Sequence, residues 1–200
     1  MRKMILASSN KHKLEEIQDI LKDFDFNLVT MKDAGLVDYE IIEDGDTFEE
    51  NALIKARTVR DELGVDSIAD DSGLMVEYLN GAPGVYSARY SGENANDQKN
   101  NDKLLKELKN ISEKDRNAKF VSVIAVAFTD GREFTVRGEV EGVIIEEFRG
   151  SNGFGYDPLF YMSKIDKTMA QLNKDEKNKI SHRARSLEKL KTVITDYIGE

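Results

Sequence analysis

The run FVSVIAVAF, from Phe120 to Phe128, decides the class of fold that the sequence predicts. Apart from Ser122 its residues are apolar, and several have β-branched side chains, which is typical of a buried strand. Asp130 and Gly131 follow as a strong turn signal, so a second strand is expected to return beside the first. We interpret this segment as a hairpin near the centre of a sheet.

Helical and extended segments alternate on the N-terminal side of this hairpin. Lys3 to Ala7 and Phe26 to Met31 are predicted strands, and Leu14, Ile17 and Leu21 recur between them at the spacing of a helix. Further along, residues 67 to 69 form a predicted strand that ends in an acidic pair, and a polar helix is expected at about 96 to 109.

Two helices are marked by their first residues. Thr47 and Glu50 form a capping box, and Ser181 is a candidate N-cap of the last helix. A turn-rich segment lies between them at Gly150 to Pro158. Together these elements predict an α/β protein with a mixed sheet flanked by helices, in which residues 1–200 form one domain.

The composition limits the compartment and the partners. The 29 basic and 38 acidic residues give a net charge of −9, which opposes nonspecific attraction to nucleic acid or to an anionic membrane. The sequence contains no cysteine, so a disulfide framework and a thiolate metal site are excluded. The apolar run Met4–Ala7 is too short for a signal peptide or a membrane span. We therefore expect a cytoplasmic protein without a nucleic-acid or membrane partner.

A first polar cluster lies at the junction between the first strand and the first helix. It consists of Ser8, Ser9, Asn10, Lys11 and Lys13. Unsatisfied amides, the helix dipole and a lysine at such a junction can hold phosphate oxygens. The alternative is an ordinary polar helix cap with solvated lysines.

A second cluster is acidic. Glu43 and Asp44 precede the capped helix, and Asp70 and Asp71 follow the predicted strand. Carboxylates from separate segments can hold Mg²⁺ and leave positions for water and phosphate. Since adjacent strand residues point to opposite faces, we expect only one of Asp70 and Asp71 to enter such a site. The alternative is a set of turn and capping acids on an acidic surface.

Two more clusters lie in the C-terminal quarter of the chain. The turn GFGYDP, Gly153 to Pro158, suits a flat ring with polar edges, although aromatic residues in turns also serve as core plugs. The other cluster consists of Lys177, His182 and Arg183, near the start of the last helix. A cation at this end interacts unfavourably with the helix dipole. An anionic or electron-rich partner would explain this placement, and a solvated surface face is the alternative.

These clusters resemble the motifs of the non-standard purine NTP pyrophosphatase family, also called inosine triphosphate or dITP/XTP pyrophosphatases. The resemblance implies an elongated mixed sheet with helices in two lobes, a cleft between the lobes, and usually a homodimer. It also implies Mg²⁺-dependent hydrolysis of purine nucleoside triphosphates to a monophosphate and pyrophosphate. The matching stretches are SSNKHKLEEI at 8 to 17, EDGDTFEENALIKA at 43 to 56, ADDSGLMVEYLNGAPGVYSARYSG at 69 to 92, GFGYDPLF at 153 to 160 and KNKISHRARSL at 177 to 187.

The resemblance also implies roles for individual residues. Asp71 resembles the proton acceptor and a metal-site carboxylate, and Glu43 resembles the second metal-site acid. The residues that resemble phosphate and sugar contacts are Ser8, Ser9, Asn10, Lys11, His12, Lys13, Lys55, Ser72 and Lys177. Those that resemble the base pocket are Phe154, Gly155, Tyr156, Asp157, His182 and Arg183.

A mechanism can be predicted from these roles. Asp71 would orient or deprotonate the water that attacks the α-phosphorus, while Lys13, Lys55 and Lys177 offset charge on the leaving pyrophosphate. His182 and Arg183 would donate to the 6-oxo group of hypoxanthine or xanthine, which adenine lacks. Phe154 or Tyr156 would stack on the ring.

Two alternatives stay open at this point. One is a catalytically silent nucleotide sensor that keeps the pocket. The presence of Asp71, Glu43 and the lysines disfavours it. The other is a pyrophosphatase of related architecture that acts on modified pyrimidine nucleotides. A nucleic-acid-binding protein is disfavoured by the charge and by the lack of a basic stripe.

Overall fold

The structure is a computed structural model that describes residues 2–8, 10–22 and 26–198. Its strands are β1 (Arg2–Ala7), β2 (Phe26–Thr30), β3 (Ser67–Val76), β4 (Asn117–Ala127), β5 (Glu133–Ile144), β6 (Phe160–Met162) and β7 (Lys167–Thr168). Its α-helices are α1 (Lys11–Leu21), α2 (Phe48–Leu63), α3 (Asp97–Glu107), α4 (Lys174–Ile180) and α5 (His182–Ile198). Short 3₁₀ helices lie at Glu77–Leu79, Gly84–Arg89, Glu113–Asp115 and Met169–Gln171.

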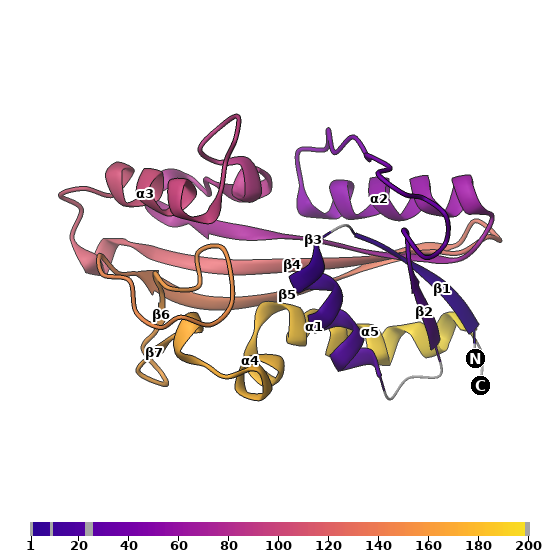
Figure 1. Ribbon diagram of the computed structural model, residues 1–200. Helices are drawn as coiled ribbons and strands as arrows, with labels where there is room; N and C mark the ends of the chain where they lie inside the picture. The colour runs from indigo at the N-terminus through magenta and orange to yellow at the C-terminus, as the bar shows by residue number, and fades with distance from the viewer. Residues whose placement is uncertain (1, 9, 23–25, 199–200) are drawn as a thin grey trace. The chain divides into compact units, whose positions relative to one another are not determined.

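The strands form one mixed sheet, as the sequence predicts. Within the described ranges the sheet has seven strands in the order β2-β1-β3-β4-β5-β6-β7 (Figure 1). β1 pairs in parallel with β2 and β3, whereas β6 pairs antiparallel with β5 and β7. The α/β class with a mixed sheet and flanking helices is therefore confirmed.

The chain divides into two compact units. The first contains Met1–Asp71, Ser122–Gly138 and Arg183–Glu200, and the second contains Ser72–Val121 and Glu139–His182. Each of the three long strands β3, β4 and β5 contributes one part to the first unit and the other part to the second.

The first unit has helices on both faces of its strands. α1 and α5 lie on one side and α2 lies on the other (Figure 1). Alternate residues of β1 face opposite sides, so Met4 and Leu6 join the core beneath α1 and α5. The helix residues in that core are Ile17 and Leu21 of α1 with Leu187, Leu190 and Ile194 of α5.

The predicted capping box starts α2. Thr47 Oγ1 accepts from Glu50 N at 3.1 Å, and Glu50 Oε2 accepts from Thr47 N at 3.1 Å. Such a cap stabilises a helix by about 1 kcal/mol. Ala52, Ala56 and Val59 are fully buried, so α2 presents its small apolar face to the sheet.

The predicted hairpin is confirmed as β4 and β5, and β4 is the fourth of the seven strands. Phe128 N donates to Arg132 O at 2.9 Å and Gly131 N donates to Phe128 O at 3.0 Å, which closes the turn. Gly131 has a φ of 90°, a backbone angle that favours glycine.

The second unit has its own apolar core. Leu104 and Leu108, in and directly after α3, pack with residues of β3, β4, β5 and β6 and with Tyr156 from the turn-rich segment. The other buried members are Leu74, Val76, Ala118, Phe120, Val140, Ile144, Leu159, Phe160, Met162, Met169 and Leu172.

Two sequence-based expectations are wrong in detail. β3 does not end at the acidic pair but runs on to Val76, because Leu74 and Val76 are buried and extend the strand past the polar residues. Lys177 precedes the last helix as expected, but it belongs to a separate helix, α4, that was not predicted. A capping box of Asn173 and Glu176 starts α4, so the sequence did carry a signal for this helix.

Candidate active site

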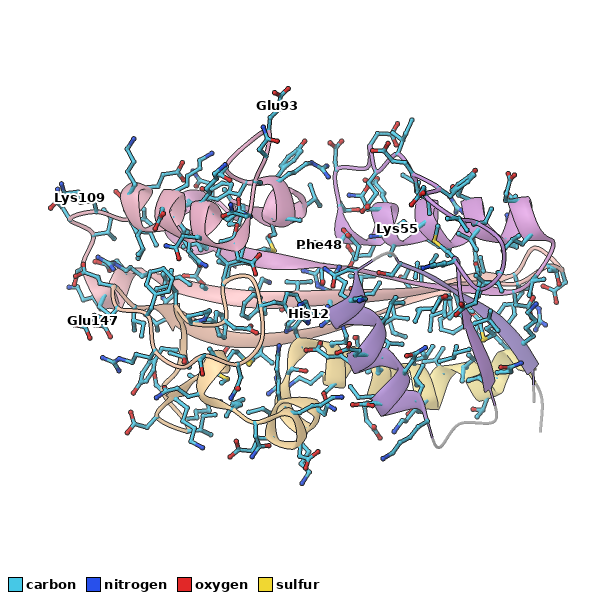
Figure 2. The ribbon with its side chains drawn as sticks, in the orientation of Figure 1. His12, Phe48, Lys55, Glu93, Lys109 and Glu147 are labelled. Carbon is cyan, nitrogen blue, oxygen red and sulfur yellow. The ribbon has the colours of Figure 1, made fainter. Side chains whose placement is uncertain are left out.

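A lysine shared by two carboxylates forms the centre of the site in the first unit. Lys55 Nζ lies 2.8 Å from Glu43 Oε2 and 2.8 Å from Asp71 Oδ1. Lys55 is labelled on α2 in Figure 2, where it shares the buried face of that helix with Ala52 and Ala56. Glu43 comes from the loop before α2 and Asp71 from β3. Three separate segments thus bring together three of the predicted site residues.

The electrostatics of this group favour a charged lysine and a basic carboxylate. Burial alone would lower the pKa of Lys55, but Asp71 and Glu43 outweigh it and raise the pKa, so the ammonium stays charged. Burial raises the pKa of Asp71, although Lys55 and Lys13 act against this rise. A carboxyl with a raised pKa is the stronger base once it is ionised.

The same carboxylates fit a magnesium ion. Asp71 Oδ2 is buried and has no hydrogen-bond partner among the described residues, so it can accept a ligand. The side chain of Glu43 is 30% exposed, which leaves it open to a ligand that enters from solvent. Mg²⁺ is commonly held by one or two carboxylates together with water and substrate phosphates. In the described part of the chain no group of three or more His, Cys, Asp or Glu residues could hold a metal, so these two acids would need such additional ligands.

Asp70 faces a different set of cations from its neighbour Asp71. Its Oδ2 lies 2.9 Å from Lys13 Nζ and 3.2 Å from Arg183 Nη2, and its Oδ1 accepts from Ser122 Oγ at 2.7 Å. Arg183 belongs to α5, whereas the partner of Asp71 belongs to α2 on the other side of the strands (Figure 1). Asp70 and Asp71 therefore point to opposite faces, as the strand geometry predicts.

The cations around Asp70 determine its protonation state. Burial alone would raise the pKa of Asp70, but the charges of Arg183 and Lys13 and the hydrogen bond from Ser122 outweigh it. They hold the pKa of this carboxyl well below its usual range. Asp70 is thus ionised at neutral pH and keeps Lys13 beside the strand that carries Asp71.

Arg183 lies in a buried ion-pair network. Its side chain is 1% exposed, and its guanidinium bonds to Glu16 of α1 as well as to Asp70. Burial alone would lower the pKa of Arg183, but these two carboxylates outweigh it and raise the pKa, so the guanidinium remains charged. The predicted role of Arg183 in the base pocket stays a prediction. Sequence reasoning missed Glu16, whose partner lies 167 positions away.

The junction between β1 and α1 has the geometry of a capped helix. Asn10 Oδ1 accepts from Lys13 N at 3.2 Å and Ser8 Oγ accepts from Asn10 N at 3.3 Å. Lys11 and His12 are exposed at the start of α1, where Figure 2 labels His12. Ser9 lies outside the described residues. Phosphate binding at this junction stays a prediction.

The second unit brings together Phe154, Asp157 and Lys177. Asp157 Oδ2 accepts from Phe154 N at 3.0 Å and from Lys177 Nζ at 2.8 Å. The ammonium of Lys177 lies 4.8 Å from the centre of the half-buried Phe154 ring. A cation over this ring adds electrostatic attraction to its packing.

The other predicted base-pocket residues differ in their exposure and contacts. Tyr156 is 4% exposed and its hydroxyl donates to Ser87 O at 2.8 Å, so it fills the core of the second unit. His182 is 5% exposed and stacks on Phe120, with ring centroids 4.9 Å apart. Ser72 is half-buried in β3, directly after Asp71.

Sequence reasoning also missed two residues of α3. Asp97 Oδ2 accepts from Gly155 N at 2.7 Å, and Asn101 Nδ2 donates to Gly155 O at 2.8 Å. Their i, i+4 spacing places both side chains on one face of the helix, which was the available signal.

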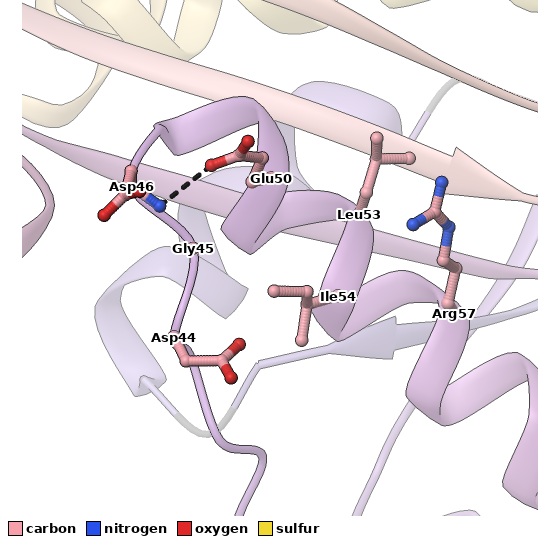
Figure 3. Close-up of a pocket in the computed structure, with 7 residues that line it drawn as sticks. All are labelled: Asp44, Gly45, Asp46, Glu50, Leu53, Ile54 and Arg57. Atoms are coloured by element: carbon pink, nitrogen blue, oxygen red, sulfur yellow. Dashed lines mark hydrogen bonds between the residues drawn. The ribbon is translucent and has the colours of Figure 1, made fainter.

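A pocket of about 430 Å³ lies beside the loop that carries Glu43 (Figure 3). Glu50 Oε2 accepts from Asp46 N at 2.8 Å at its edge. Of the acidic cluster considered in the sequence, its lining includes only Asp44, and we assign the pocket no role in the site. The lining residues are Asp44, Gly45, Asp46, Glu50, Leu53, Ile54 and Arg57.

The chain closely matches known proteins over nearly its whole length. The dITP/XTP pyrophosphatases of Clostridium perfringens and Bacillus licheniformis are 51% and 50% identical to it. The first match covers 96% of both chains, and the second covers 97% of this chain and 98% of the relative. Among the described residues, no helix is both long and apolar enough to cross a membrane.

Solved structures agree with the sequence matches. The Staphylococcus aureus Ham1 protein has a TM-score of 0.88 at 42% identity, covering 98% of this chain and all of its own. A HAM1 protein from Coxiella burnetii has a TM-score of 0.89 at 43% identity, with 98% and 100% covered. The sequence profile described as the Ham1 family matches residues 4–193. The resemblance found in the sequence is thereby confirmed, and the chain belongs to the Ham1 family.

Proposed function

We propose that this protein is a nucleoside-triphosphate pyrophosphatase that hydrolyses non-standard purine nucleotides such as dITP, XTP and ITP in a Mg²⁺-dependent reaction. Relatives at about 50% identity over the full chain carry the name dITP/XTP pyrophosphatase, which supports the reaction class. The observation that carries the proposal is the group of Lys55, Glu43 and Asp71, in which a buried carboxylate oxygen is left to accept a ligand.

The catalytic residues would act mainly by positioning and by charge. Mg²⁺, when bound, would supply charge neutralisation on the triphosphate, and Glu43 and Asp71 are the residues that would hold it. Asp71 orients the attacking water and takes its proton, because its Oδ2 is unoccupied by the protein's own donors. Lys55 and Lys13 offset negative charge on the departing pyrophosphate.

Selectivity for the base would come from residues of the second unit. Phe154 is the candidate for stacking, since Tyr156 is used in the core. His182 is the candidate donor to a 6-oxo group. A donor that faces the 6-amino group of adenine would remain unpaired, and a buried unpaired group opposes binding.

Product analysis tests the proposal directly. Pyrophosphate and monophosphate release is measured from ITP, XTP, dITP, GTP and ATP, each with Mg²⁺ and with EDTA. We expect metal-dependent release of both products, fastest from the inosine and xanthosine nucleotides. Orthophosphate as the product, or a standard nucleotide as the best substrate, would contradict the proposal. Tight ITP binding without turnover would instead indicate a nucleotide sensor.

Assembly and location are separate parts of the proposal. The homodimer that the family resemblance implies and the cytoplasmic location that the composition favours remain predictions. Sedimentation velocity at several protein concentrations tests the homodimer, and a constant monomer mass would contradict it.

A further inference from the structure

Two side chains of α3 hold the peptide groups on either side of Gly155. The carboxylate of Asp97 accepts from Gly155 N at 2.7 Å, and the amide of Asn101 donates to Gly155 O at 2.8 Å. The first of these bonds is charge-assisted and therefore strong for its kind. Gly155 has a φ of 62°, in the left-handed region that favours glycine. The path of the chain directly after Phe154 is thus fixed from α3.

The chain directly before Phe154 is fixed from within its own turn. Asp157 Oδ2 accepts from Phe154 N at 3.0 Å, and Phe154 O accepts from Asp157 N at 3.3 Å. Both peptide groups that flank Phe154 are therefore hydrogen-bonded. The side-chain torsions of Phe154 are its main remaining freedom, so its ring loses little entropy when it stacks on a ligand.

Asn101 carries a further sign of a positioning role. It is 2% exposed, and its Nδ2 also donates to Asp97 O at 2.9 Å. Its Oδ1 is buried without a hydrogen-bond partner among the residues that the structure describes. If the amide were turned the other way, Oδ1 would face the carbonyl oxygens of Asp97 and Gly155, so acceptors would meet acceptors. Nδ2 is therefore the atom that faces these two carbonyls. A buried oxygen without a partner opposes stability, which favours a role for Asn101 other than packing.

We propose that Asp97 and Asn101 are positioning residues that hold the Phe154 turn in place and thereby set the affinity for the purine base. This inference rests on the proposed function, because it takes Phe154 as the base-stacking residue. It predicts that disrupting the contacts of α3 weakens recognition of the base and leaves recognition of the phosphate chain unchanged.

Two ligands separate these effects. Inosine monophosphate carries the base, whereas inorganic tripolyphosphate carries only the phosphate chain. For Asp97→Ala and Asn101→Ala we expect calorimetry to show the Kd of inosine monophosphate rising by about tenfold, ~1.4 kcal/mol. The Kd of tripolyphosphate should change by less than about twofold, ~0.4 kcal/mol. With ITP as substrate, KM should rise while kcat at saturation stays within about threefold of the wild type.

Conservative and matched variants serve as controls. Asp97→Asn keeps an acceptor for Gly155 N and should recover most of the affinity for inosine monophosphate. Asn101→Asp should be at least as damaging as Asn101→Ala, because it sets a carboxylate against Gly155 O. Asn100→Ala removes a neighbouring asparagine that is 3% exposed and contacts Ser91 N and Ala88 O instead. It should lower the melting temperature yet leave the Kd of inosine monophosphate near the wild-type value.

The outcomes are distinct from those of the proposed function. Release of pyrophosphate from ITP by the wild type tests the proposed function. This inference is tested by the ratio of the affinity for inosine monophosphate to the affinity for tripolyphosphate in the variants. An unchanged ratio in both alanine variants of an active enzyme would overturn the inference alone. This holds whether the two affinities stay at their wild-type values or weaken by the same factor. Asp97 is exposed at the first turn of α3, so Asp97→Ala keeps the test usable even where Asn101→Ala does not fold.

Discussion

Lys55 Nζ lies 2.8 Å from Asp71 Oδ1, and the same ammonium lies 2.8 Å from Glu43 Oε2. The side chains of Lys55 and Asp71 are 9% and 10% exposed, so this contact is only weakly screened by water. The lysine balances the two acids in the protein alone. Its positive charge therefore opposes the binding of a divalent cation at the same two carboxylates.

This competition leads to a prediction for Lys55→Met. The variant should bind Mn²⁺ in the absence of nucleotide about tenfold more tightly than the wild type, ~1.4 kcal/mol, because a competing positive charge is removed. Its turnover of ITP should fall, since charge on the leaving pyrophosphate is no longer offset. Electron paramagnetic resonance of free Mn²⁺ measures the first effect and pyrophosphate release measures the second.

Lys13→Met is the matched control for this experiment. Lys13 pairs directly with Asp70, whereas its charge acts on Asp71 without an ion pair among the described residues. Lys13→Met should slow turnover and tighten the binding of Mn²⁺ by less than Lys55→Met does, because Lys13 acts on Asp71 more weakly than Lys55 does. Equal Mn²⁺ affinity in Lys55→Met and the wild type would show that Lys55 does not compete for the carboxylates.

Asp71→Asn should separate nucleotide binding from chemistry. The amide keeps an oxygen for Lys55 but can no longer take a proton, so turnover should drop by about 100-fold or more. The Kd of ITP should change by a much smaller factor than turnover does. Single-turnover pyrophosphate release and equilibrium binding of ITP in EDTA measure the two quantities. Activity within about tenfold of wild type, ~1.4 kcal/mol, would exclude Asp71 as the base.

Asp44→Asn is the companion variant for Asp71→Asn. Asp44 is an exposed acid next to Glu43, so its neutralisation changes the local charge by the same amount. Turnover of this variant should stay within about twofold of the wild type, because screened surface charges act weakly.

His182 should contribute to the choice of base. His182→Ala should lower the ratio of kcat/KM for ITP over ATP by about tenfold or more, because a donor to the 6-oxo group is lost. His182→Gln, which keeps a donor, should retain part of the preference. An unchanged ratio in His182→Ala would remove His182 from the base pocket. Arg183→Ala is a poor test of the same idea, since it also removes a buried positive charge that pairs with Glu16 and Asp70.

Local signals in the sequence account for the features that were predicted correctly. The capping box at Thr47 and Glu50 fixes where α2 starts, and the β-branched run at 120–128 with its Asp-Gly turn fixes the hairpin. The two-residue period of a strand was enough to separate Asp70 from Asp71.

Contacts between distant parts of the chain could not be predicted in this way. In the sequence Arg183 is a basic residue at the start of a predicted helix. Its partner Glu16 lies 167 positions away, and no local pattern indicates that the two residues pair. The contact of Asn101 with Gly155 spans 54 positions. Helix α4 was missed for another reason, because its seven residues carry no repeating apolar stripe.

The buried network around Asp70 predicts a stability that depends on pH. Asp70→Asn should lower the free energy of unfolding at neutral pH by about 3 to 5 kcal/mol, because Arg183 and Lys13 lose a buried counter-charge. Glu188→Gln serves as the control: Glu188 is exposed and pairs with Lys191 at 3.3 Å, so its neutralisation should cost less than about 1 kcal/mol.

The sign of the pH dependence follows from the lowered pKa of Asp70, which Arg183 and Lys13 hold down against the effect of burial. An aspartate in the unfolded chain titrates near pH ~3.9. The stabilisation by ionised Asp70 is therefore complete above that pH and is lost as the pH falls through the folded-state pKa. Urea unfolding should show a constant difference between wild type and Asp70→Asn from about pH 8 to pH 5, and a shrinking difference below about pH 4. A difference that stayed constant or grew below pH ~4 would mean that Asp70 is not held ionised by these cations.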